Sequence, residues 1–147
     1  MNNYNNNLMK LQNQYHKNCL FNSDEFGTEY HFNDDGSFVL HFFCNKRYQG
    51  YDNIMHGGMI SALIDSAMTK CLFGHGVKAY TVRLNIKYIK PVKINEKLSI
   101  IVNIMDNESE IITMLNANLL QNDQKLVKAE AKFWILKKFS KEYKSNR

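Results

Sequence analysis

Apolar residues at helical spacing between Met59 and Phe73 predict one long and largely buried helix. They stand at positions 59, 60, 62, 63, 67, 68, 71 and 72, which surround most of a helical cylinder. Ser61, Asp65 and Thr69 recur at every fourth residue and form a single polar stripe. Because a carboxylate inside an apolar helix is costly unless it is paired, hydrogen-bonded or used, Asp65 is the first candidate for chemistry.

Beyond Gly74 and Gly76 the apolar residues change to a period of two, which is typical of half-buried strands. The first such stretch is expected to carry on one face Tyr80, Val82, Leu84, Ile86 and Tyr88. Three further stretches alternate in the same way, over residues 98–104, 111–119 and 127–135. A run of β-branched and aromatic residues predicts another strand over 37–44, ahead of the helix. Short turns make the last strands antiparallel neighbours.

One long apolar helix followed by antiparallel strands predicts an α+β domain, in which a curved sheet wraps around the central helix. A chain of 147 residues fits one such domain. We expect residues 1–34 to form a partly helical N-terminal extension, residues 35–136 the domain itself, and residues 137–147 a basic C-terminal tail.

Composition narrows the classes of function. The net charge is +5, but no helix-turn-helix, zinc or RNA-stacking motif accompanies it, so we expect no nucleic-acid partner. No apolar run approaches the ~20 residues of a membrane span, and the asparagine-rich start lacks the apolar stretch of a secretory signal. The three widely spaced cysteines are typical of free, buried thiols. We therefore expect a cytoplasmic protein without a membrane partner.

The middle of the chain carries a combined motif. It consists of "HGG" at His56–Gly58, Asp65 nine residues after the histidine, and the strand "TVRLNIKYIKPV" that begins at Thr81. With the flanking strands, this order resembles the hotdog fold of the PaaI-like acyl-CoA thioesterases, in the 4-hydroxybenzoyl-CoA thioesterase superfamily. The resemblance covers about residues 35–136 and implies hydrolysis of an acyl-CoA to a free carboxylic acid and coenzyme A, with no cofactor.

The resemblance also implies roles for the motif residues. The amide of Gly57, with Gly58 beside it, would form an oxyanion hole at the helix N-terminus. Asp65 would act as general base or as nucleophile, and the Thr81 hydroxyl would orient the attacking water. His56 either contacts the substrate or fixes the turn. The glycine pair, Asp65 and Thr81 each have a purely structural alternative. The glycines would only form a tight turn, Asp65 would be a hydrogen-bonded structural acid, and Thr81 would be chosen for its strand propensity.

Two features of substrate binding stay open. Some relatives carry Asn or Gln about six residues before the glycine pair as a second carbonyl or water contact, whereas this chain has Gly50, with Gln49 or Asn53 as a substitute. Basic residues after the helix are candidates for binding the phosphates of coenzyme A, and we select Arg83 and Lys90 among them. The alternative is that these residues belong to an ordinary solvated strand face. The histidines show no metal-ligand spacing, so we predict no metal.

The spacing of the motif predicts a shared site. Gly57 and Asp65 are eight residues apart, or about 12 Å along one helix, too far to meet at one thioester. We therefore expect a homodimer, or a dimer of dimers, whose sites combine two chains. Two other functions remain: an acyl-CoA-binding hotdog protein without turnover, and a hotdog dehydratase or hydratase, which would use a histidine in a proline-containing motif that is missing here.

Overall fold

The computed structural model describes residues 3–22, 26–105 and 109–139. The central helix α2 spans Gly57–Gly74, and an N-terminal helix α1 spans Asn3–Tyr15. The strands are β1 (Glu29–Phe32), β2 (Phe38–Cys44), β3 (Val77–Tyr88), β4 (Glu96–Ile104), β5 (Ile112–Gln121) and β6 (Gln124–Lys138). Two short 3-10 turns are η1 (Leu20–Asn22) and η3 (Lys46–Tyr48).

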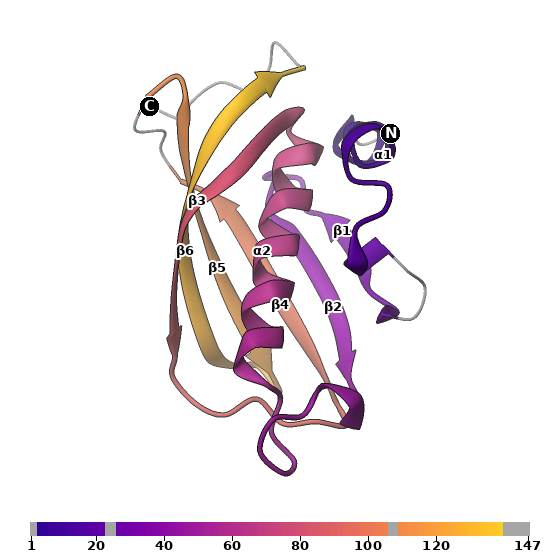
Figure 1. The fold of residues 1–147 in the computed structure, drawn as a ribbon, viewed down its shortest axis with the longest axis vertical. Helices are drawn as coiled ribbons and strands as arrows, with labels where there is room; N and C mark the ends of the chain where they lie inside the picture. Colours follow the sequence, from indigo (N-terminus) through magenta and orange to yellow (C-terminus); the bar gives the residue numbers. More distant parts are fainter. Residues whose placement is uncertain (1–2, 23–25, 106–108, 140–147) are drawn as a thin grey trace.

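All six strands form one antiparallel sheet in the order β1-β2-β4-β5-β6-β3. The sheet curves around one side of α2, while α1 packs beside the C-terminal half of α2 (Figure 1). This arrangement agrees with the predicted α+β domain, in which a curved antiparallel sheet packs against one long central helix. The strand β1 lies within residues 1–34, so the sheet starts earlier than the expected domain boundary at residue 35.

The core lies between α2 and the concave face of the sheet. Leu63, Ile64 and Met68 on α2 are fully buried, as are alternate residues of β5 such as Leu115 and Leu119. The expected period of two therefore holds in β5, because its other side chains are only half buried on the opposite face. Asn122 and Asp123 turn the chain into β6 with positive φ angles of 49° and 61°, the geometry that two-residue hairpins favour.

The pairing of β3 with β6 corrects the expected strand faces. Thr81 pairs with Phe133, but the next pair is Arg83 with Lys132, so Val82 is the extra residue of a β-bulge. The bulge shifts the alternation by one position. Tyr80 and Val82 are consequently 61% and 55% exposed instead of sharing a buried face with Leu84.

The C-terminal half of α2 is enclosed by α1. Leu8 and Leu11 of α1 are buried, and the Asn7 side chain donates a hydrogen bond to the Gly74 carbonyl at 3.1 Å. Lys70 is only 2% exposed, although sequence reasoning gave it no role. Of the predicted basic tail, only residues 137–139 lie within the described part of the chain.

Candidate active site

The first turn of α2 is built by the His-Gly-Gly motif. His56 is the N-cap, with φ −61° and ψ 128°, and its Nδ1 accepts a hydrogen bond from the Gly58 N–H at 2.9 Å. The His56 carbonyl in turn accepts the Ile60 N–H at 3.1 Å. A Cβ at Gly58 would lie 2.9 Å from His56 Cε1, so the second glycine makes room for the capping ring. His56 therefore fixes the turn, one of its two expected roles.

The backbone N–H of Gly57 takes no part in this cap. Within the described residues, no hydrogen bond is recorded for the Gly57 N–H, whereas the Gly57 carbonyl accepts the Tyr88 hydroxyl at 2.9 Å. A helix N-terminus carries partial positive charge on such amides. Of the two glycines, Gly57 is therefore the one whose N–H has no recorded partner in the described part of the chain, because the Gly58 N–H donates to His56.

A hollow of about 290 Å³ lies in front of this turn, lined by Gly50, Tyr51, Met55, His56 and Gly57. The loop that forms it is closed by a hydrogen bond from the Gly50 N–H to the Ile54 carbonyl at 2.9 Å. The Tyr51 side chain is 86% exposed at its edge. The hollow is therefore open to a ligand that approaches the Gly57 amide.

Asp65 and Thr81 meet two turns further along α2. The Thr81 hydroxyl donates to Asp65 Oδ1 at 2.7 Å, and no other hydrogen bond to this carboxylate is recorded in the described part of the chain. Asp65 is half buried and Thr81 is exposed, so the pair stays accessible. Its second oxygen is consequently placed to accept a proton or to contact an electrophile.

The remaining predicted substrate-binding residues lie apart from this pair. Asn53 is in the loop before α2 with a positive φ of 66°, and its backbone N–H donates a hydrogen bond to the Gln49 side-chain oxygen at 3.3 Å. Arg83 pairs with Lys132 one step along the ladder from the inward pair Leu84 and Ala131, so it points away from α2. Lys90 follows the end of β3 and is exposed. The chain therefore brings together Thr81 with Asp65, and His56 with the glycine pair.

Comparison with known proteins identifies the fold and its relatives. A sequence model of the thioesterase superfamily matches residues 52–114, a range that contains His56, Gly57, Asp65 and Thr81. A search of curated proteins finds no significant match. Three solved structures are similar to this chain.

A hypothetical thioesterase from Streptococcus pneumoniae, solved with coenzyme A, has a TM-score of 0.71 at 18% identity, over 77% of this chain and 91% of that one.

A Streptococcus mutans protein bound to acetyl-CoA has a TM-score of 0.68 at 20% identity, over 75% of this chain and 88% of that one. The E. coli PaaI protein, from the phenylacetic acid degradation operon, has a TM-score of 0.76 at 13% identity, over 90% of this chain and 96% of that one. The resemblance to PaaI-like hotdog thioesterases is confirmed. Two variant structures of the S. pneumoniae protein replace a threonine and an aspartate by alanine, at positions 16 residues apart.

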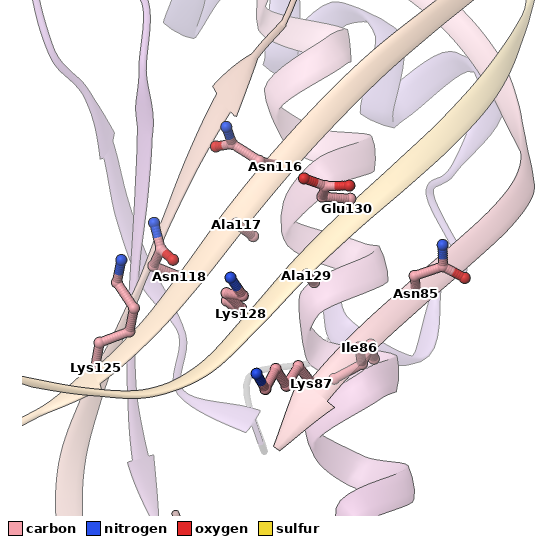
Figure 2. A pocket seen from close by; sticks show the side chains of 10 residues that line it. All are labelled: Asn85, Ile86, Lys87, Asn116, Ala117, Asn118, Lys125, Lys128, Ala129 and Glu130. Atoms are coloured by element: carbon pink, nitrogen blue, oxygen red, sulfur yellow. The ribbon is translucent and has the colours of Figure 1, made fainter. Parts of the chain in front are cut away.

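A second hollow of this PaaI-like fold, on the sheet, contains none of the predicted site residues. This hollow of about 480 Å³ on β3, β5 and β6 is lined by Asn85, Ile86, Lys87, Asn116, Ala117, Asn118, Lys125, Lys128, Ala129 and Glu130. Their polar side chains lie on the face of the sheet turned away from α2 (Figure 2). Among the described residues, no group of three or more His, Cys, Asp or Glu side chains is placed to hold a metal. None of the helices described is long and apolar enough to span a membrane.

Two contacts escaped sequence reasoning. The hydroxyl of Tyr88 reaches the helix terminus, whereas the sequence marks this residue as part of a half-buried strand and of the motif strand that begins at Thr81, without indicating its partner. The Tyr51 side chain borders the hollow from a loop without periodicity. The tyrosine near the end of the motif strand was the available signal for the first contact, but its partner depends on how β3 crosses α2.

Proposed function

We propose that this protein is an acyl-CoA thioesterase that hydrolyses a thioester to a free carboxylic acid and coenzyme A. The observation that carries the proposal is the hydrogen bond between Thr81 and Asp65 in an accessible position on α2. Their separation of 16 residues equals that of the threonine and aspartate replaced in the S. pneumoniae variants. Coenzyme A and acetyl-CoA in the two streptococcal structures support a ligand of this class.

The Gly57 N–H is the proposed oxyanion donor. As a nucleophile adds to the thioester carbonyl carbon, negative charge develops on the carbonyl oxygen, and an amide about 3 Å away stabilises it. His56 holds the neighbouring Gly58 amide, so the donor belongs to a fixed helix turn instead of a mobile loop. Such preorganisation avoids the cost of reorienting the donor during the reaction.

Asp65 supplies the base or the nucleophile. As a base it takes a proton from water, the resulting hydroxide adds to the carbonyl carbon, and the C–S bond breaks to release the coenzyme A thiolate, which is then protonated. As a nucleophile it adds directly, releases the thiolate and leaves a mixed anhydride that water hydrolyses. In both routes Thr81 holds one carboxylate oxygen and leaves the other toward the substrate.

The proposed site is shared between two chains. Gly57 and Asp65 lie eight residues apart on α2, about 12 Å at 1.5 Å per residue, so one carboxylate does not reach a carbonyl held by the amide of the same chain. The strand β3 is an edge of the sheet with only β6 beside it, and its 12 residues offer a second copy an unpaired edge. An antiparallel pairing of two β3 edges would place two α2 helices across a two-fold axis.

Shared sites are tested with two inactive variants. Gly57→Pro removes the donor at the first helical position, where proline is tolerated, and His56 already has the extended conformation that precedes proline. In a purified mixed dimer of Gly57→Pro with Asp65→Asn, one site carries both changes and the other carries neither, so about half of wild-type activity should return. Mixed dimers that remain inactive would show that each chain builds its site alone.

Release of thiol from a panel of acyl-CoAs with short, long and aromatic acyl groups tests the function itself. We expect turnover of at least one member, with equal amounts of acid and coenzyme A formed. Saturable binding of acyl-CoA without thiol release would instead identify a binding protein. Formation of an enoyl or hydroxyacyl product with the thioester intact would identify a dehydratase or hydratase.

A further inference from the structure

The start of α2 has an unusual requirement. Two consecutive glycines give the backbone more conformational freedom than any other pair of residues, yet an oxyanion donor has to be held in one orientation. We propose that Tyr88 is a positioning residue for thioester hydrolysis. It binds the Gly57 carbonyl and so limits rotation about the Gly57 Cα atom, which keeps the N–H on the other side of that atom facing the substrate; this inference rests on the proposed function.

The peptide units on both sides of the Gly57 Cα atom are anchored. On the preceding side, the His56 carbonyl accepts the Ile60 N–H at 3.1 Å. On the following side, the Gly58 N–H donates to His56 Nδ1, and the Gly57 carbonyl accepts the Tyr88 hydroxyl at 2.9 Å. Tyr88 is the one anchor among these that comes from outside the helix and its cap. It therefore fixes the first turn relative to the sheet.

The bulge at Val82 is what brings Tyr88 to this place. After the bulge, Leu84, Ile86 and Tyr88 share the face of β3 that is turned to α2, the same face as Thr81 before it. The Tyr88 ring lies 3.7 Å from the position that a Cβ at Gly57 would take, so ring and hydroxyl both border the glycine. Without the extra residue, Thr81 and Tyr88 would lie on opposite faces of the strand.

β3 thus makes one hydrogen bond to each of the two proposed site residues of α2. Thr81 binds Asp65, and Tyr88 binds Gly57. If sites are shared, these two contacts of one chain serve two different sites, because its Gly57 and its Asp65 face different substrates. Tyr88 then acts only on the site to which its own Gly57 contributes.

Tyr88→Phe is the first test, since phenylalanine keeps the ring and removes the hydroxyl. We expect kcat for the best acyl-CoA to fall about fivefold, the usual effect of losing one neutral hydrogen bond, while KM changes by less than about twofold. Tyr80→Phe is the matched control. Tyr80 lies on the same strand, is 61% exposed, and its hydroxyl has no hydrogen bond recorded among the described residues. It should leave kcat unchanged.

Mixed dimers separate positioning from a general loss of structure. In the dimer of Gly57→Pro with Asp65→Asn, the intact site uses Gly57 of the Asp65→Asn chain. Tyr88→Phe added to that chain should lower the recovered activity about fivefold, and the same change added to the Gly57→Pro chain should have no effect. Thr81→Ala should show the opposite preference, because the working Asp65 belongs to the Gly57→Pro chain.

Each outcome has one meaning. An active wild type whose kcat is unaffected by Tyr88→Phe overturns the role of Tyr88 and leaves the proposed function intact. An equal loss of activity with Tyr88→Phe in either chain of an active mixed dimer also overturns it, because a structural defect acts on both sites. A wild type that releases thiol from no acyl-CoA overturns the proposed function, and the positioning role falls with it.

Discussion

Asp65 and Lys70 are charged residues five positions apart on the same helix, and their surroundings differ in kind. Asp65 is half buried, with one recorded hydrogen bond, from Thr81. Lys70 is 2% exposed, and its Nζ donates to Gln12 Oε1 at 2.6 Å and to Asn22 Oδ1 at 2.8 Å. The acid faces an accessible region, whereas the base is enclosed beneath α1 and η1.

The difference separates a group available for chemistry from a group that holds the fold together. A buried ammonium is stable only when hydrogen bonds replace its water, and Lys70 has two such acceptors from segments distant in sequence. It therefore ties α1 and η1 to α2. The Asp65 carboxylate has one recorded hydrogen bond in the described part of the chain, from Thr81, and its oxygens have further lone pairs that can accept hydrogen bonds.

The largest expected effect is that of Asp65→Asn. The amide preserves the shape of the side chain but is neither a base nor a nucleophile, so kcat should fall by about 10²–10⁴ while the substrate still binds. Steady-state thiol release and equilibrium binding of acyl-CoA measure the two quantities. Asp123→Asn is the control, because Asp123 sits in the β5–β6 turn with a positive φ of 61° that asparagine tolerates. Full turnover by Asp65→Asn would place the chemistry elsewhere.

A smaller effect is expected from Thr81→Ala. It removes the hydrogen bond that orients the carboxylate, so kcat should fall about tenfold, in line with a hydrogen bond to a charged group. Thr81→Ser keeps a hydroxyl and should retain most of the activity. If serine and alanine were equally impaired, the hydroxyl would not be the relevant feature of Thr81.

The smallest effect on turnover is expected from Lys70→Met, which should leave kcat within about twofold. Its effect belongs to stability. Burial lowers the pKa of Lys70 to about 8 from its ordinary value of 10.5. Between these values the unfolded chain binds more protons than the folded chain, so the free energy of unfolding rises with pH.

This rise amounts to about 1 kcal/mol between pH 7.5 and pH 9. Urea unfolding at both pH values should show that the free energy of unfolding rises more with pH in the wild type than in Lys70→Met. Burial raises the pKa of the Cys44 thiol to about 11, which lowers stability above pH 9, but this contribution is common to both proteins and cancels in the difference. An identical pH dependence in the two proteins would mean that Lys70 titrates normally and is not desolvated.

The sequence was sufficient for the parts of the fold that periodicity controls. The helix was expected over 59–73 and spans Gly57–Gly74, and the strand expected over 98–104 is β4, Glu96–Ile104. The four-residue strand β1 was missed because so short a stretch shows no repeat. The bulge at Val82 was missed because the apolar residues still alternate in the sequence, although the extra residue places those before and after it on opposite faces of the strand.

Motif and spacing selected the candidate site residues, but not their partners. The hydrogen bonds of Thr81 to Asp65 and of Tyr88 to Gly57 join residues 16 and 31 positions apart. Such contacts depend on how β3 crosses α2. The burial of Lys70 likewise follows from the position of α1, because on the helix alone its place looks like any other polar position. The assignment of roles to Gly57, Asp65 and Thr81 stays a prediction.

A crystal structure of the Asp65→Asn variant with a bound acyl-CoA tests the central claim most directly. The account predicts the thioester carbonyl oxygen about 3 Å from the Gly57 N–H of one chain, with the side chain at position 65 of a second chain beside the carbonyl carbon. The Tyr88 hydroxyl should remain on the Gly57 carbonyl. A thioester bound away from the start of α2, or one that contacts neither Gly57 nor position 65, would contradict the account.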